Sequence, residues 1–327
     1  MSNPEATAIV VPEDTASDSD SAYGSELSSY TTSLSSSVNK YQWENGRRYH
    51  SYRAGSYQFP NDEKEQDRYE LMHHIVKLLL KDRLYLAPIK EGPIRVLDIG
   101  TGTGTWAVEM GDLHPEASVI LGNDLSPIQT SWVPPNVRFV VDDVESEWLG
   151  QPYDFIHSRY MAGSILDWPR LARQCYENLN PDGWVEFQDF DLEVFSEDGS
   201  IPADNKVVEF YRLLLEACDK INRTASPGRH IKKWVEDAGF QNVQERVYKV
   251  PLGPWPKDPE LKQIGSLNML QFLDGLEAFS SATFTHVLGW SIEEVQVFLA
   301  QVRKDARQKG VHTLHRYNVV WGQKVVT

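Results

Sequence analysis

Residues 96–106 read Val-Leu-Asp-Ile-Gly-Thr-Gly-Thr-Gly-Thr-Trp, an apolar run that ends in an acid and continues into three alternate glycines. Residues 94–99 predict a buried strand, and residues 106–113 predict a helix behind the glycines. Glycines at such a junction let the backbone approach a ligand closely, and the start of the helix offers unpaired amide donors. The stretch therefore predicts a loop that binds a nucleotide-like cofactor within an α/β fold.

The glycine spacing and the acid distinguish this loop from a dinucleotide-binding loop. The dinucleotide pattern places its third glycine three positions after the second and requires no acid before the first. Here Gly104 follows Gly102 by two positions, and Asp98 precedes the first glycine. A carboxylate at Asp98 would repel a pyrophosphate and attract an ammonium group, such as that on the methionine half of S-adenosylmethionine (SAM). The residues therefore favour SAM over NAD.

Further acids follow the next two predicted strands. Residues 118–122 predict a strand, and Asp124 lies twenty residues beyond the last glycine, where a ribose-binding acid is expected. Its carboxylate can accept hydrogen bonds from both ribose hydroxyls; the alternative is that it caps the following turn. Residues 137–141 predict the third strand, which ends at Asp142 and Asp143. One of these two acids could bind an adenine amino group while the other caps the next segment.

Strands and helices continue to alternate along the chain. Residues 153–156 and 184–188 predict the fourth and fifth strands, with a helix at 171–179 between them. This alternation indicates parallel pairing, and ligands in such sheets lie at the carboxyl ends of the strands. Residues 243–250 and 312–320 predict two more strands. We therefore expect a Rossmann-like α/β fold with a seven-stranded, mostly parallel sheet.

Other segments have the apolar spacing of helices. They are residues 67–86, 204–223, 228–238, 261–276 and 292–309. The last two lie within residues 251–311, between the final two strands. This helical insert is our candidate for a cap over a substrate.

The composition restricts the class of protein. The chain of 327 residues is 41% hydrophobic and carries a formal net charge of −15, which argues against a broad nucleic-acid surface. No run of about eighteen apolar residues could span a membrane, and the start of the chain does not resemble a secretion signal. The two cysteines, Cys175 and Cys218, are far apart in the sequence, which predicts reduced thiols in the cytoplasm or nucleus.

Residues 1–39 differ from the remainder. They contain six acids, no Lys or Arg, and a stretch rich in Ser and Thr at residues 25–37. Such a segment has too little apolar content to fold alone, so we predict a disordered tail before one catalytic domain at residues 40–327. The tail is either a phosphorylated regulatory arm or an extension without a role.

Together these motifs resemble class I SAM-dependent methyltransferases, and more narrowly the fungal LaeA-like methyltransferases, some of which are associated with secondary metabolism. The resemblance covers about residues 40–325. Its narrower part rests on residues 41–50 and 60–63, and on the combination of residues 96–104 with 123–129. Many members have Val where this chain has Asn123. The resemblance implies that the last two strands form a terminal antiparallel pair. It also implies that residues 41–50, with Tyr52 and Tyr57, fold over the cofactor; the alternative is a surface anchor.

The resemblance also implies which residues at the strand ends bind each part of the cofactor. Residues 98–104 would hold the methionine end, Asp124 the ribose, and Asp142 or Asp143 the adenine. His157 and Ser158 would lie beside the transferring methyl. The predicted cofactor-binding set is Asp98, Gly100, Thr101, Gly102, Thr103, Gly104, Asp124, Leu125, Asp142, Asp143, Val144, His157 and Ser158.

A methyltransferase mainly aligns a nucleophile with the methyl group and excludes water, so a general base is optional. If the acceptor is a hydroxyl, the candidate bases are His157, Tyr160 and also His230. We predict no metal site, because Asp189 and Asp191, placed after the fifth strand, are weak evidence for one. No Asn/Asp-Pro-Pro-Tyr motif follows the fourth strand, which counts against DNA base methylation.

Three functions remain. The leading one is methylation of O, N or C of a small-molecule acceptor in fungal secondary metabolism. The second is a LaeA-like nuclear regulator that acts with protein partners. The third is a SAM-binding protein without catalysis.

Overall fold

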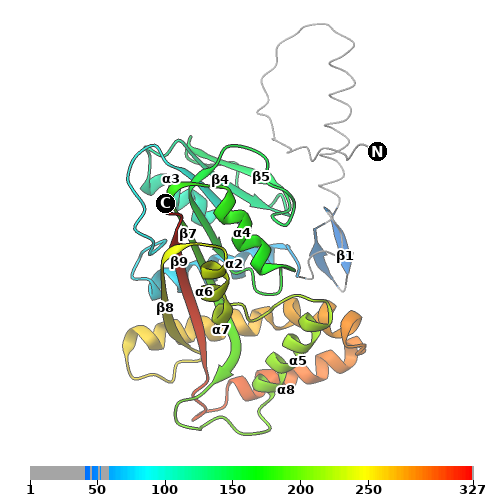
Figure 1. The fold of residues 1–327 in the computed structure, drawn as a ribbon. Coiled ribbons are helices and arrows are strands. Elements are labelled where there is room, and N and C mark those ends of the chain that lie inside the picture. Colours follow the sequence, from blue (N-terminus) through cyan, green and yellow to red (C-terminus); the bar gives the residue numbers. More distant parts are fainter. Residues whose placement is uncertain (1–40, 45, 51, 53–58, 326–327) are drawn as a thin grey trace, which may run out of the picture.

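The computed structural model describes residues 41–44, 46–50, 52 and 59–325; the predicted tail lies outside these residues. A seven-stranded sheet with the order β5-β4-β3-β6-β7-β9-β8 forms the centre (Figure 1). The strands are β3 (Arg95–Ile99), β4 (Val119–Asp124), β5 (Val137–Val141), β6 (Tyr153–Arg159), β7 (Leu179–Phe195), β8 (Gln241–Pro251) and β9 (Leu314–Gln323). Strands β3 to β7 pair in parallel, whereas β9 runs antiparallel to both β7 and β8. This confirms the predicted Rossmann-like sheet with a terminal antiparallel pair.

Helices cover both faces of the sheet. They are α2 (Glu63–Leu79), α3 (Thr105–Leu113), α4 (Trp168–Glu177), α5 (Lys206–Lys220), α6 (Gly228–Asp237), α7 (Pro259–Ala282), α8 (Ile292–Ala306) and the π-helix η1 (Thr283–Val287). Val96 packs with α2 and α3 on one face, and Leu97 packs with α4 and α6 on the other. Because successive strand residues point to opposite faces, a strand buried on both faces is apolar throughout, as β3 largely is.

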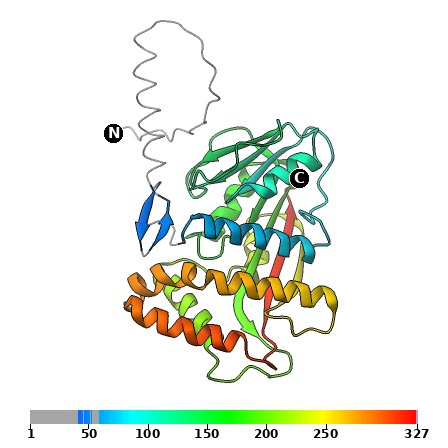
Figure 2. The same ribbon diagram turned by 180° about the vertical axis from the view of Figure 1, so that it is seen from behind.

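A second helical region lies beyond the carboxyl end of β7 (Figure 1). Helices α5, α7, η1 and α8 share a separate apolar core there. Figure 2 shows α2 lying along α7, so α2 connects this region to the sheet. The predicted insert at 251–311 contains α7, η1 and α8.

Several predicted helices have different limits in the structure; α7, for example, ends at Ala282 rather than at residue 276. Helix α2 begins after Asp62, whose side chain accepts a hydrogen bond from the Glu65 amide, and it ends at Leu79 rather than at residue 86. The chain leaves the helix because Lys81 and Asp82 adopt positive φ. Helix α4 begins after the N-cap Asp167 and ends at Glu177, two residues earlier than predicted.

Strand β7 begins earlier and extends further than residues 184–188. It includes Asp182, which has a φ of +63°, and the register with β6 shifts between Tyr153 and Phe155. Asp189 and Asp191 therefore lie within the strand, paired with β9, and not after it as predicted. No helix among the described residues is long and apolar enough to cross a membrane.

The N-terminal motif forms a hairpin of β1 (Gln42–Glu44) and β2 (Arg47–Tyr49). Buried Arg47 pairs with Asp62, with 2.5 Å between Nε and Oδ2, and the Asn61 amide donates to the Arg48 carbonyl at 2.7 Å. These contacts fix the hairpin to the start of α2. Tyr57, which the predicted cover included, lies outside the described residues.

Candidate active site

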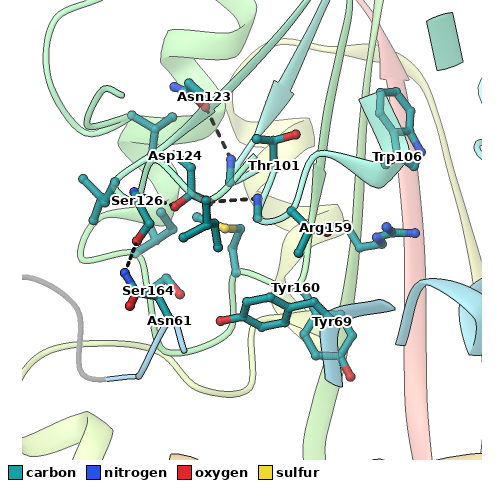
Figure 3. A pocket seen from close by; sticks show the side chains of 18 of the residues that line it. Asn61, Tyr69, Thr101, Trp106, Asn123, Asp124, Ser126, Arg159, Tyr160 and Ser164 are labelled. Carbon is teal, nitrogen blue, oxygen red and sulfur yellow. Dashed lines mark hydrogen bonds between the residues drawn. The ribbon is translucent and has the colours of Figure 1, made fainter. Parts of the chain in front are cut away.

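A cleft lies where the chain leaves β3, β4, β5 and β6. Its empty volume is about 1160 Å³, including the part open to solvent. Of the predicted cofactor-binding residues, the structure brings these together along its wall: Gly100, Thr101, Gly102, Thr103, Asp124, Leu125, Asp142, Asp143 and Val144. Figure 3 shows Thr101, in the loop after β3, near Asp124, the last residue of β4. None of the described residues of the β1–β2 hairpin lines the cleft.

The loop after β3 depends on glycine at two positions. Gly100 and Gly104 have φ values of +66° and +86°. A Cβ at Gly100 would lie 2.2 Å from the Met161 sulfur, and a Cβ at Gly104 would lie 2.3 Å from the Phe139 ring. Both conformation and space therefore require glycine there. Asn123 also supports the loop, because its Oδ1 accepts from the Gly100 amide at 3.4 Å.

Asp124 fixes the next loop and also lines the cleft. Its Oδ2 accepts from the Gly102 amide and its Oδ1 from the Ser126 amide, each at 2.9 Å. Burial raises the pKa of Asp124 to about 6, although these amide donors oppose the shift. Each carboxylate oxygen can accept more than one hydrogen bond. The two interpretations of Asp124, a turn cap and a ligand-binding acid, are thus compatible.

The structure places Asp98, Gly104, His157 and Ser158 outside the lining of the cleft. In the sheet register, Asp98 is opposite His157 and Ile99 is opposite Ser158. Because β6 continues to Arg159, His157 and Ser158 lie inside the sheet rather than beyond its edge. The cleft lining therefore does not support the expectation that they lie beside the transferring methyl, which stays a prediction.

Asp98 and His157 form a buried support beneath the glycine loop. His157 Nδ1 lies 2.7 Å from Asp98 Oδ1, and the Thr101 hydroxyl donates to Asp98 Oδ2 at 2.6 Å. The His157 ring stacks on Trp106 with 3.8 Å between ring centroids. Burial lowers the pKa of His157, so the neutral ring can donate from Nδ1 to the carboxylate. Asp98 therefore acts on the loop through Thr101, and His157 orients Asp98.

Sequence reasoning missed several residues that line the cleft, including Asn61, Tyr69, Arg159 and Met161. Asn61 donates to the Ser126 hydroxyl at 3.1 Å, which connects the segment before α2 with the loop after β4 (Figure 3). Arg159 Nη2 lies 2.9 Å from His73 Nδ1 and places a cation at the cleft. Asn61 belongs to residues 60–63, which carry part of the family resemblance, but the sequence alone indicates no role for its side chain.

The remaining candidate bases differ in position. Tyr160 lines the cleft with a φ of +67°, an uncommon conformation for a residue with a bulky side chain. Burial raises its pKa well above the ordinary value for tyrosine, so the hydroxyl stays protonated at neutral pH and is a donor rather than a base. His230 is exposed on α6 and lines neither this cleft nor its neighbour.

A second cavity, with an empty volume of about 720 Å³, shares Tyr69 and Tyr160 with the cleft. Figure 3 shows these two rings on the side of the cleft away from the glycine loop. The second cavity is lined by Phe59, Arg68, Tyr69, Tyr160, Ala162, Asp189, Phe190, Leu192, Tyr211, Leu214, Ala225, Asn268, Gln271, Phe279 and His315. These residues come from the segment before α2, from α2, α5 and α7, from β7 and β9, and from the connecting loops.

The two acids of β7 have separate environments. Asp189 lines the second cavity, its Oδ2 accepts from the Met161 amide at 2.7 Å, and burial raises its pKa to about 7. Asp191 instead pairs with Arg229, with 2.7 Å between Oδ2 and Nη2. Within the part of the chain that the structure describes, no group of three or more His, Cys, Asp or Glu side chains could hold a metal ion.

The model of the methyltransferase domain family matches residues 64–245. The chain belongs to this methyltransferase family. The methyltransferase is 53% identical over 300 residues to "Methyltransferase pytC" of Aspergillus terreus, covering 91% of this chain and 93% of pytC. It is 36% identical over 284 residues to "Secondary metabolism regulator LAE1" of Cochliobolus heterostrophus, covering 84% and 92% of the two chains. It is 33% identical over 302 residues to "Protein-methionine methyltransferase laeA" of Emericella nidulans, covering 91% and 79%.

The chemistry of the cleft fits SAM, the methyl donor of this family. SAM carries hydrogen-bond donors on its ammonium group, ribose and adenine, and the cleft offers the carboxylates of Asp124, Asp142 and Asp143 as acceptors. Arg159 can pair with the methionine carboxylate. The cofactor of this methyltransferase is SAM, as predicted from the acids that follow the strands.

Proposed function

We propose that this enzyme transfers the methyl group of SAM to a small molecule of fungal secondary metabolism, and that the acceptor binds in the second cavity. The observation that carries the proposal is the shared wall. Tyr69 and Tyr160 line both the cofactor cleft, which contains the carboxylates, and the largely aromatic cavity. An acceptor in the cavity would therefore lie next to the cofactor, apart from bulk water. The identity to pytC supports this acceptor class.

We assign the cofactor groups to the loops as follows. The backbone of residues 100–103 holds the methionine end, Asp124 holds the ribose, and residues 142–144 hold the adenine, while Arg159 pairs with the methionine carboxylate. Asp98 and His157 are positioning residues, since they contact Thr101 and not the cleft. SAM supplies an electrophilic methyl carbon when it is bound. The protein's contribution is to align the acceptor and exclude water.

Asp189 is the group best suited to receive a proton from the acceptor. Its pKa of about 7 leaves a substantial fraction ionised at neutral pH, and it lines the cavity next to Tyr160. An acceptor that loses no proton during methylation would not need this group. We expect the enzyme in the cytoplasm or nucleus, because Cys175 and Cys218 are buried and form no disulfide.

A protein methionine is a second candidate acceptor. One relative is named a protein-methionine methyltransferase, and Met72 and Met161 line the cofactor cleft of this chain. Intact-protein mass spectrometry after incubation with SAM distinguishes this case, since self-methylation adds one methyl mass to the protein. A regulatory role with a protein partner, as LAE1's name suggests, would instead appear as SAM binding without a methylated small molecule.

The first experiment is a calorimetric titration of the purified protein with SAM, repeated with Asp124→Ala. Loss of the carboxylate removes charge-assisted hydrogen bonds worth about 3 kcal/mol together, so we expect binding about a hundredfold weaker. Asp112→Ala is the matched control, because Asp112 is an exposed acid on α3 outside the cleft. Equal affinity of wild type and Asp124→Ala would refute the assignment of the ribose site.

The second experiment tests methyl transfer to a small molecule. The protein is incubated with isotope-labelled SAM and an organic extract of fungal metabolites, and labelled products are sought by mass spectrometry. A labelled small molecule supports the proposal. SAM binding without any labelled product, from extracts of several secondary-metabolite producers, would count against it.

A further inference from the structure

His315, on β9, is a buried polar residue without a hydrogen-bond partner. Its side chain is 2% exposed and lines the second cavity. Neither Nδ1 nor Nε2 has a hydrogen-bond partner among the described residues. A buried imidazole in this state has lost its hydrogen bonds to water and gained none from the protein, which is unfavourable for folding.

The surroundings of His315 hold the ring in place without pairing its nitrogens. Phe190 and Tyr211 pack edge to face against it, with centroid distances of 5.9 and 5.0 Å. Burial lowers the pKa of His315 to about 4, and the negative charge of Asp191 only partly opposes this shift. The ring is therefore neutral at pH 7 and presents one N–H donor and one bare nitrogen acceptor.

The other polar side chains in the cavity that come from α2 and α7 already have partners. Arg68 Nη2 pairs with Glu65 at 2.6 Å. Asn268 donates to the Pro251 carbonyl at 2.8 Å, and Gln271 donates to Asn268 Oδ1 at the same distance. His315 therefore differs from these polar side chains of α2 and α7, because no protein group among the described residues pairs with its nitrogens, so that an occupant of the cavity can do so.

The charged side chains that line the cavity, Arg68 and Asp189, already have partners. The Arg68 guanidinium lies over the rings of Tyr69 and Phe279, at 5.2 and 4.7 Å from their centroids, so a resident cation already occupies two of the aromatic faces of the cavity. An anionic ligand would have to compete with Glu65 for Arg68. The oxygens of Asp189 accept from the Met161 and Phe190 amides.

We propose that the second cavity binds a neutral, ring-containing molecule and that His315 recognises a hydroxyl group on it. A hydroxyl can either accept from the N–H of a neutral imidazole or donate to its bare nitrogen, so it can pair with whichever His315 nitrogen faces it. The remaining wall is largely aromatic and aliphatic and suits a planar ring system. A volume of about 720 Å³ lies within the ordinary range for small-molecule sites. The inference rests on the proposed function for its claim that this molecule is the methyl acceptor, but binding can be tested without methyl transfer.

The test uses four probes with the same ring system: 2-naphthol, naphthalene, 2-naphthoate and 2-naphthylmethylammonium. Each is titrated by ligand-observed NMR into the full-length protein with S-adenosylhomocysteine present, and again without it. We expect 2-naphthol to bind about threefold to tenfold more tightly than naphthalene, as one neutral hydrogen bond to His315 allows. We expect both charged probes to bind more weakly than 2-naphthol.

Two variants test whether His315 causes the preference for 2-naphthol over naphthalene. His315→Phe keeps the ring shape and removes both nitrogens, so it should bind 2-naphthol and naphthalene equally. His315→Gln keeps a donor and an acceptor and should retain part of the preference for 2-naphthol. A preference for 2-naphthol that persists in His315→Phe, tighter binding of a charged probe, or no binding of any probe by wild type would overturn the proposal.

SAM titration of the same preparations separates this inference from the proposed function. If wild type binds SAM but shows no His315-dependent binding of 2-naphthol, only the inference about the cavity fails. If 2-naphthol binds as expected but SAM does not, the proposed function fails while the cavity remains a hydroxyl-binding site. Unchanged SAM affinity of His315→Phe shows that this variant is folded.

Discussion

The cofactor cleft and the second cavity are neighbours, but they are built differently. The cleft comes mainly from residues that directly follow β3, β4, β5 and β6, so most of its lining lies in short, consecutive loops. The cavity takes residues from Phe59 to His315, contributed by helices and strands that are distant in the sequence. The first is an edge of the sheet, whereas the second exists only when the helical region packs against that edge.

Their polar groups also differ. In the cleft, Asp124 accepts hydrogen bonds from two backbone amides, and Asp98 beneath it accepts from Thr101. In the cavity, His315 has no partner among the residues that the structure describes. The comparison suggests that the cofactor site is organised before the ligand binds, whereas the cavity carries a polar group that the fold leaves unsatisfied.

The largest effect is expected from breaking the backbone of the cleft with Gly104→Ala. The left-handed conformation costs a non-glycine residue about 1–2 kcal/mol, and the clash with Phe139 adds about 1–3 kcal/mol. Urea unfolding should show that the free energy of unfolding falls by about 2–5 kcal/mol, the two costs taken together. Calorimetry should show loss of SAM binding, because the glycine loop must move.

Gly289→Ala is the matched control for this change. Gly289 has a φ of +77°, and a Cβ there would meet no atom within 4 Å. It should therefore lose only the conformational part, about 1–2 kcal/mol, and bind SAM normally. Equal losses in the two variants would show that contact with Phe139 contributes nothing.

A smaller effect is expected from the titration of Asp124. Its pKa of about 6 means that the carboxylate is ionised at pH 7 and mostly protonated at pH 5. A protonated carboxyl loses acceptor capacity for the ribose hydroxyls, so SAM should bind about tenfold more weakly at pH 5 than at pH 7. Calorimetry at both values measures this ratio, and Asp124→Asn should abolish it. A wild-type affinity that does not change between these values would show that ionised Asp124 is not required.

The same difference explains what the sequence could predict. The glycine loop and residues 142–144 follow their strands directly, and Asp124 is the last residue of β4, so finding the strands was enough to find them. The sequence does not reveal that His157 lies outside the cleft lining, because the end of β6 depends on its register with β3. Arg159, two residues further, is the first residue after His157 that lines the cleft.

The second cavity could not be predicted by the same means. Phe190, Tyr211 and Phe279 have the spacing of ordinary core residues, and only the packing of α2 and α7 against the sheet leaves space between them. His315 lies in a strand that was predicted correctly, but the lack of a partner is a property of the three-dimensional arrangement.

The smallest effect is expected from His315→Phe, as a change in the stability of the protein. It tests whether the cavity carries a polar group that the fold does not need. A phenyl ring keeps the edge-to-face contacts with Phe190 and Tyr211 and removes two buried nitrogens that lack partners. We expect a gain of about 0.5–1 kcal/mol in the free energy of unfolding, measured by urea denaturation at pH 8 without ligand. At that pH the imidazole is neutral in both states, because its pKa is about 4 in the folded protein and about 6.5 in the unfolded chain, so no protonation change contributes. If His315 stabilised the fold, its replacement by Phe would lower the free energy of unfolding. That result would mean that His315 stabilises the protein through contacts beyond those described. A gain in stability together with weaker 2-naphthol binding is the result expected of a group retained for its ligand.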